Sequence, residues 1–74
     1  PMYYDFDYIK TVEEANKELK NLPDNFGGSL YLNGLASAEG LKLPETIGYS
    51  LSLDGLTSVE KEKLKNKYPK IKIY

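Results

Sequence analysis

A 21-residue segment occurs twice in succession, and this duplication constrains the fold more than any other feature of the chain. The first copy is LPDNFGGSLYLNGLASAEGLK, residues 22–42, and the second is LPETIGYSLSLDGLTSVEKEK, residues 43–63. The two copies align without a gap and are identical at eleven positions. A period in the twenties is typical of proteins that stack one supersecondary unit per repeat, because each unit buries its apolar face only against a neighbour.

Alternating aliphatic residues predict a short strand in each copy and a third strand near the end of the chain. The residues expected to point into the core are Leu30, Leu32, Leu51, Leu53, Ile71 and Ile73. The spacing is 21 residues from the first strand to the second and 20 from the second to the third. Because parallel strands need a long return connection, this spacing predicts a parallel ladder in which Ile71 lies beside Leu51.

Neither Asn33-Gly34 nor Asp54-Gly55 is expected to form a hairpin, although both dipeptides suit a two-residue turn. They stand at the same place in the two copies, and neither is followed by a matching strand. We expect Leu35 and Leu56 to continue the inward pattern as the chain bends away. Residues 24–28 are expected to form a turn into the strand.

The segments before and after the repeats predict a strand and a helix at each end. Residues 3–9 alternate aromatic and acidic side chains, which favours a strand, parallel to the others, with Tyr4, Phe6 and Tyr8 on one face. Thr11 and Glu14 have the spacing of a capping box and should begin a helix that runs to about residue 21. Thr57 and Glu60 repeat that spacing before a second helix, which should end at Pro69. In this second helix, the side chains expected to point inward are Val59, Leu64 and Tyr68.

The predicted fold class is therefore α/β, with the element order β-α-β-β-α-β in a single domain. Residues 1–21 are expected to form an N-terminal cap, residues 22–42 and 43–63 the two repeats, and residues 64–74 a C-terminal cap strand. Pro1 precedes Met2, which we expect to be the natural start after tag cleavage. The same element order also fits a ferredoxin-like α+β fold, in which the second and third strands would form an antiparallel hairpin.

The repeat, written LP-x-x-[F/I]-G-x-S-L-x-L-x-G-L, resembles the short leucine-rich-repeat-like units of bacterial and phage-associated proteins. The resemblance covers residues 22–56 and, more loosely, the closing strand after Pro69. It implies a short parallel β-solenoid with helical caps, whose strands line a concave sheet. In that family the concave sheet is usually a protein-binding face.

The candidate partner-binding residues follow from strand parity, because alternate side chains of a strand point to opposite faces. If the aliphatic residues point inward, one outward row contains Tyr31, Ser52 and Lys72. A second row contains Asn33, Asp54 and Tyr74, and a third contains Ser29, Ser50 and Lys70. Tyrosines among small polar residues are typical of protein-recognition surfaces. The alternative interpretation is an ordinary solvated face, and Asp5 or Asp7 would extend the rows if the first strand joins the sheet.

The aromatic residues of the first strand leave two interpretations open. In the first, Tyr4 and Tyr8 belong to the core and keep only their hydroxyl groups in water. In the second, they form an aromatic and acidic edge with Asp5 and Asp7 that docks on a basic partner. Two acids on one strand imitate the phosphates of a nucleic acid only weakly.

Composition excludes several chemical classes. The chain has no cysteine and no histidine, and therefore lacks thiolate chemistry and the commonest general base and metal ligand. We expect no enzymatic activity, no cofactor and no metal site. No apolar run approaches the roughly 20 residues of a membrane helix, and we expect a cytoplasmic protein. The C-terminal lysines suggest nucleic acid only weakly, because Glu60 and Glu62 interleave with them and arginine is absent.

The predicted function is that of a small, non-enzymatic protein-binding module. The resemblance to phage-associated repeats suggests more narrowly an inhibitor of a host protein, in the manner of anti-defence proteins such as anti-CRISPRs. A self-associating structural unit, in which the chain forms a homodimer, is the main alternative. A nucleic-acid-binding module is the third hypothesis.

Overall fold

A computed structural model of the chain describes residues 2–74 and contains both helices and short strands, in agreement with the predicted α/β class. The elements are β1 (Tyr3–Asp5), α1 (Val12–Leu19), β2 (Asn25–Phe26), β3 (Ser29–Tyr31), β4 (Thr46–Ile47), β5 (Leu51–Ser52) and α2 (Ser58–Lys67). The interpretation of Pro1 lies outside the described residues.

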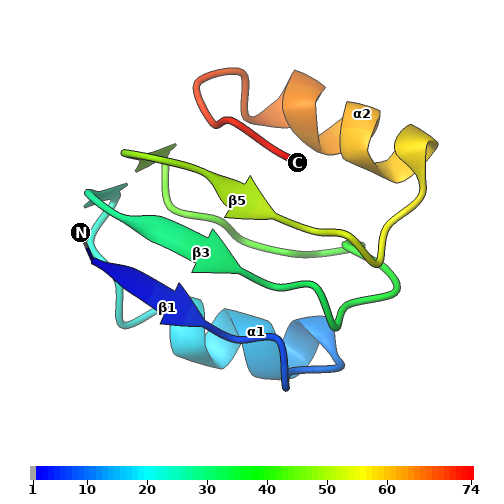
Figure 1. Ribbon diagram of the computed structural model, residues 1–74, viewed down its shortest axis with the longest axis horizontal. Coiled ribbons are helices and arrows are strands. Elements are labelled where there is room, and N and C mark those ends of the chain that lie inside the picture. The colour runs from blue at the N-terminus through cyan, green and yellow to red at the C-terminus, as the bar shows by residue number, and fades with distance from the viewer. Residues whose placement is uncertain (1) are drawn as a thin grey trace.

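The main sheet has the strand order β1-β3-β5, and its neighbouring strands are parallel (Figure 1). Leu30 lies beside Leu51, so the predicted 21-residue register is confirmed. On the other side Leu30 lies beside Tyr4, which shows that the first strand joins the sheet. Leu30 N–H donates to the Ser50 carbonyl at 2.9 Å, as the parallel register requires.

The C-terminal segment, predicted as a strand, pairs with β5 through an isolated bridge, in a different register from the predicted one. Ile73, rather than Ile71, lies beside Leu51, and the Leu51 N–H donates to the carbonyl of Lys72 at 2.8 Å. The return between Leu51 and Ile73 contains helix α2, and a helix advances only about 1.5 Å per residue. A helical return therefore needs more residues than an extended one to cover the same length, which explains why the predicted spacing was too short.

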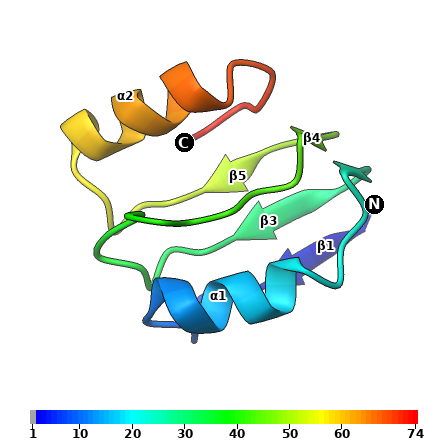
Figure 2. The ribbon, with the colours of Figure 1, turned by 180° about the vertical axis from the view of Figure 1, so that it is seen from behind.

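Residues 24–28 do not form the simple turn that was predicted. They contain β2, which pairs in parallel with β4 at the same 21-residue register, Phe26 beside Ile47. Both side chains are buried, which explains why an apolar residue stands at this position of each copy. Figure 2 shows this small second sheet beyond one end of the main sheet.

Helices α1 and α2 and the extended segment 36–45 cover one face of the main sheet (Figure 2). The core lies between these two layers. All six aliphatic residues predicted to point inward are buried: Leu30, Leu32, Leu51, Leu53, Ile71 and Ile73. Leu35 and Leu56 are also buried, in agreement with the expectation that the chain continues inward after the strands.

Both helices begin where the sequence predicts, although they differ from the prediction in detail. The Thr57 hydroxyl accepts from Glu60 N–H, and the Glu60 carboxylate accepts from Thr57 N–H, which completes the predicted capping box of α2. At α1 the Thr11 hydroxyl accepts from Glu14 N–H at 3.2 Å. Helix α1 ends at Leu19, earlier than predicted. Val59 does not point inward: 65% of it is exposed, at the first turn of α2.

Gly34 and Gly55 lie where the chain segments that follow neighbouring strands approach each other closely. A Cβ atom at Gly34 would lie 2.7 Å from the carbonyl oxygen of Ile9 and still nearer to that of Asp7. A Cβ atom at Gly55 would likewise lie close to the carbonyl oxygens of Asn33 and Leu35, in the segment after β3. The conserved spacing of these glycines within the repeat is therefore a packing requirement.

Candidate binding surface

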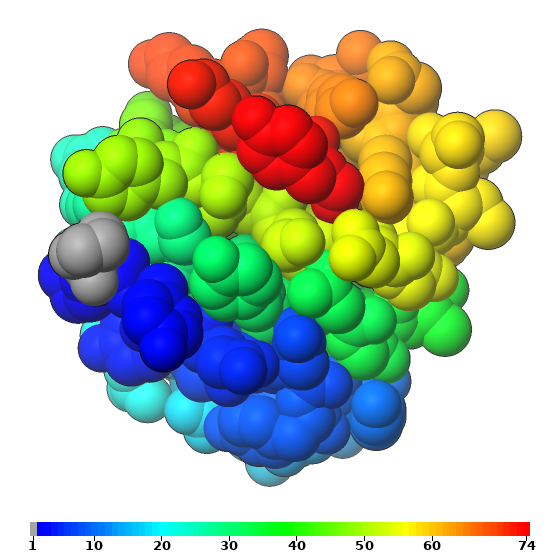
Figure 3. Space-filling view, viewed as in Figure 1, coloured from blue at the N-terminus to red at the C-terminus, as the bar shows by residue number. Residues whose placement is uncertain are grey.

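The outer face of the main sheet, which points away from the helices, carries the candidate binding residues. The register places Asp5 beside Tyr31 and Tyr31 beside Ser52. Because Ile73 lies beside Leu51, Tyr74 follows Ser52 in the same row. Figure 3 shows this face, across which β1, β3, β5 and the C-terminal strand run as blue, green, yellow-green and red bands.

The prediction that Lys72 stands beside Ser52 is wrong, and so is the placement of Tyr74 beside Asp54. The shifted register of the C-terminal strand places Lys72 next to Ser50 instead. Lys70 accordingly does not share a row with Ser29 and Ser50. The outer face thus has Lys72 at one edge, separated from β1 by β3 and β5, and a row with a tyrosine on either side of Ser52.

Asp7, Asn33 and Asp54 form a hydrogen-bonded ladder just beyond the ends of the strands. The Asp7 carboxylate accepts from Asn33 N–H at 2.8 Å, and the Asn33 side-chain oxygen accepts from Asp54 N–H at 2.8 Å. Asn33 and Asp54 are therefore brought together as predicted. Asn33 mainly positions the chain segment that follows it, because its side-chain oxygen and its backbone N–H are both used in hydrogen bonds within the protein.

An aromatic corner, which we define as Tyr3, Asp5 and Tyr31, lies at the β1 side of the outer face. The rings of Tyr3 and Tyr31 are perpendicular, with their centroids 5.9 Å apart and an interplanar angle of 88°. Tyr3 is 62% exposed and Tyr31 is 37% exposed. Sequence reasoning did not select Tyr3, although the alternation in β1 would place it on the same face as Asp5.

Tyr8 does not belong to the core, and Tyr4 is only partly covered by its neighbours. The prediction that both tyrosines are core residues is therefore wrong. The strand ends at Asp5 instead of Ile9, because the Asp5 carboxylate accepts from Asp7 N–H at 3.0 Å and the chain turns. Phe6 is buried and Tyr4 stacks on it, with ring centroids 5.5 Å apart, whereas Tyr8 is 62% exposed. An exposed aromatic and acidic edge, the second interpretation, agrees with this exposure.

Within the described part of the chain, the carboxylates of Asp5 and Asp54 have no cationic partner. Within residues 2–74 one ion pair is formed, between Lys65 and Glu62 on α2 at 3.8 Å. The same part of the chain contains no cluster of three or more histidine, cysteine, aspartate or glutamate residues that could hold a metal ion. Both aspartates are exposed and their side chains face water.

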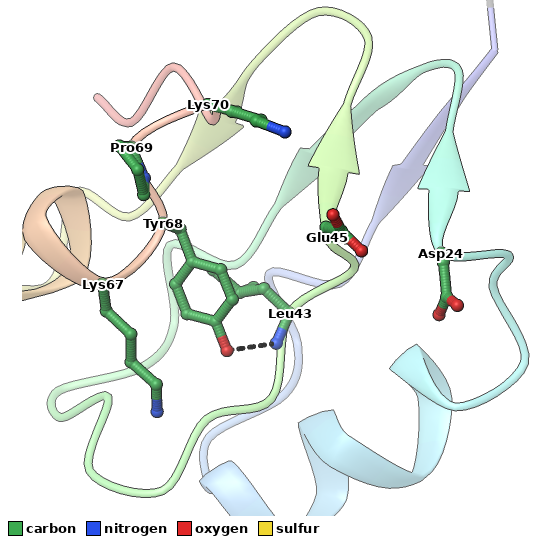
Figure 4. A pocket seen from close by; sticks show the side chains of 7 residues that line it. All are labelled: Asp24, Leu43, Glu45, Lys67, Tyr68, Pro69 and Lys70. Carbon is green, nitrogen blue, oxygen red and sulfur yellow. Dashed lines mark hydrogen bonds between the residues drawn. The ribbon is translucent and has the colours of Figure 1, made fainter.

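A second concave site lies near the C-terminal end of α2 (Figure 4). It has a volume of about 460 Å3 and is lined by Asp24, Leu43, Glu45, Lys67, Tyr68, Pro69 and Lys70. The Tyr68 hydroxyl accepts from Leu43 N–H at 3.3 Å, so this side chain ties the helix end to the extended segment. The charged groups of the lining are the carboxylates of Asp24 and Glu45 and the ammonium groups of Lys67 and Lys70.

Comparisons with models of protein families, with curated proteins and with solved structures found no match to the chain. No helix within residues 2–74 has both the length and the apolar character needed to span a membrane.

Proposed function

We propose that the chain is a short leucine-rich-repeat-like parallel solenoid that binds another protein through the outer face of its main sheet. Three observations support this architecture over the ferredoxin-like alternative. The pairs β1–β3, β3–β5 and β2–β4 are all parallel. The pairs β3–β5 and β2–β4 both join residues that are 21 apart in the sequence. Gly34 and Gly55 are also 21 apart, and each lies against the segment that follows the preceding strand of the main sheet.

The observation that carries the binding proposal is the gathering of exposed tyrosines on this face. Tyr3 and Tyr31 stand on the neighbouring strands β1 and β3, and Tyr74 stands on the C-terminal segment beyond β5, with Ser52 between Tyr31 and Tyr74 and the Asp5 carboxylate beside Tyr31. A tyrosine supplies a large contact area at little cost in side-chain entropy, and it is enriched at protein interfaces. An inhibitor of a larger host protein, the narrower function that the family resemblance suggests, would use such a face to cover part of its target.

The test is capture of a partner from an extract of the cells in which the protein acts. The immobilised chain is compared with the variants Tyr31→Ala and Tyr74→Ala, and with Val59→Ala as a matched control. Val59 is about as exposed as Tyr74 but belongs to α2. Truncation of an interface tyrosine typically costs about 1–2 kcal/mol, which weakens binding by about five- to thirtyfold. If Tyr31→Ala and Tyr74→Ala both capture as much partner as the native chain and the Val59→Ala control, the outer face is not the binding surface.

Self-association is the second candidate, because exposed tyrosines could equally cover a second copy of the chain. Light scattering between about 10 µM and 1 mM separates the two functions, since a dimer with micromolar affinity would dominate at the upper concentration. A monomer at all concentrations supports binding to another protein. A dimer that Tyr31→Ala and Tyr74→Ala dissociate supports self-association instead.

A further inference from the structure

We propose that the aromatic corner of Tyr3, Asp5 and Tyr31 binds an arginine side chain of the partner. This inference rests on the proposed function of the outer face and specifies what the partner must contribute. The partner is expected to present an exposed guanidinium group on a loop or an extended segment.

The perpendicular tyrosine rings present ring faces to a cation from two directions. Their centroids lie 5.9 Å apart, and a cation is attracted by a ring within about 6 Å of its centroid. A single group placed in the angle between the rings can therefore interact with both. Tyr31 is held in the middle strand of the sheet, with Asp5 on one side and Ser52 on the other. The corner is thus largely formed before any ligand arrives, which reduces the entropy lost on binding.

The charge at this corner is negative, and no cationic side chain among residues 2–74 forms an ion pair with it. One oxygen of the Asp5 carboxylate accepts from Asp7 N–H at 3.0 Å, which leaves the other oxygen free to accept from a ligand. Lys72 lies at the opposite edge of the sheet. The ammonium group of Lys10 lies close to Gly34, beyond the end of β3, and forms no ion pair with Asp5. A cationic group on the partner would therefore supply the charge that the corner lacks.

Arginine fits this combination better than lysine. Its planar guanidinium group can stack on a tyrosine face while its edge donates two hydrogen bonds to a carboxylate. The ammonium group of lysine is compact and strongly hydrated, and it cannot use the ring and the carboxylate in one plane. We therefore expect the corner to distinguish these two cations.

The experiment follows backbone amide shifts of the 15N-labelled full chain during titration with a capped Gly-Ser-Arg-Ser-Gly peptide. Two matched peptides replace arginine by lysine or by citrulline, which has nearly the same shape as arginine but no charge. The arginine peptide is expected to shift the amides of Tyr3, Asp5 and Tyr31, with a dissociation constant on the order of 10 mM for so small a probe. The lysine peptide should bind at least about threefold more weakly, and the citrulline peptide should cause no saturable shift.

A variant that removes only the charge of Asp5 tests the role of its carboxylate. Asp5→Asn keeps an oxygen to accept from Asp7 N–H but removes the charge, and it should weaken binding of the arginine peptide by about three- to tenfold. Asp24→Asn is the control, because Asp24 is an exposed acid in the loop between α1 and β2. The amide spectrum of each variant shows at once whether it is folded. Equal binding of arginine and citrulline peptides, or no effect of Asp5→Asn, would overturn the inference.

Failure of this inference is distinguishable from failure of the proposed function. If Tyr31→Ala abolishes capture of the partner while Asp5→Asn leaves it unchanged, the outer face binds a protein but the corner takes no cation. If neither variant changes capture, the outer face itself is not the binding surface.

Discussion

Replacement of Gly34 by alanine should destabilise the fold, because this glycine lies where the segments after β1 and after β3 are in close contact. The new Cβ atom would stand 2.7 Å from the Ile9 carbonyl oxygen and closer still to the carbonyl oxygen of Asp7. Both neighbours are backbone atoms, which cannot rotate away as a flexible side chain could. The loop after β1 or the loop after β3 would therefore have to move by a substantial fraction of an ångström.

The expected cost is that of an overpacked core position, about 1–3 kcal/mol. In a domain of this size, each kcal/mol lowers the midpoint of thermal unfolding by roughly 4–8 °C. Gly27 is the matched control, because a Cβ atom there would meet nothing within 4 Å. Gly27→Ala should be neutral or should stabilise the protein by about 0.4–1 kcal/mol, since alanine restricts the unfolded chain.

The free energy of unfolding of both variants is measured by urea denaturation, followed by circular dichroism. The difference between Gly34→Ala and Gly27→Ala should be at least about 1 kcal/mol. Equal stabilities would refute the close approach of the coils at Gly34, and with it the stacking of the segment after β3 on the segment after β1.

Three further substitutions test separate parts of the fold by the same denaturation assay. Leu51→Ala removes a fully buried side chain and should cost about 2–5 kcal/mol, whereas Val59→Ala on the surface of α2 should change stability by less than about 0.5 kcal/mol. Thr57→Ala removes the capping box of α2 and should cost about 0.5–2 kcal/mol; an unchanged midpoint would mean that the cap is not formed. Asn33→Ala deprives the Asp54 N–H of its acceptor and should cost about 0.5–1.5 kcal/mol; an unchanged stability would mean that this hydrogen bond is not formed.

The pairing of β3 with β5 could be predicted because it follows from the repeat alone. Two copies of one sequence, 21 residues apart, place equivalent leucines at the same position in neighbouring strands, and Leu30 does lie beside Leu51. The cap of α2 was also predictable, since both of its hydrogen bonds depend on residues that are close in the sequence. Such features need no knowledge of the rest of the fold.

Other features depend on distances that a residue count does not give. Ile73 took the place predicted for Ile71, because the length of a return limb depends on how much of it is helical. Strands β2 and β4 are two residues each, too short for any alternation to be recognised. Tyr8 is exposed because a single carboxylate–amide bond turns the chain after Asp5.

The composition of the candidate surface changed for the same reason. Lys72 moved out of the predicted row when the register of the last strand shifted, and Tyr74 moved in beside Ser52. Tyr3 was missed because it stands outside the alternating set of aromatic residues that drew attention to β1. Its partner on the outer face, Tyr31, could be identified only once the pairing of β1 with β3 was known.

The parallel register of the main sheet underlies the proposed solenoid and every row of the outer face. It is tested most directly by NMR detection of couplings across individual hydrogen bonds, from amide nitrogens to the carbonyl carbons that accept from them. The account predicts couplings from Leu30 N–H to the Ser50 carbonyl and from Leu32 N–H to the Ser52 carbonyl, because both bonds are 2.9 Å long in the structure. Carbonyl partners whose numbers fall as the amide numbers rise, as in an antiparallel hairpin, would contradict it.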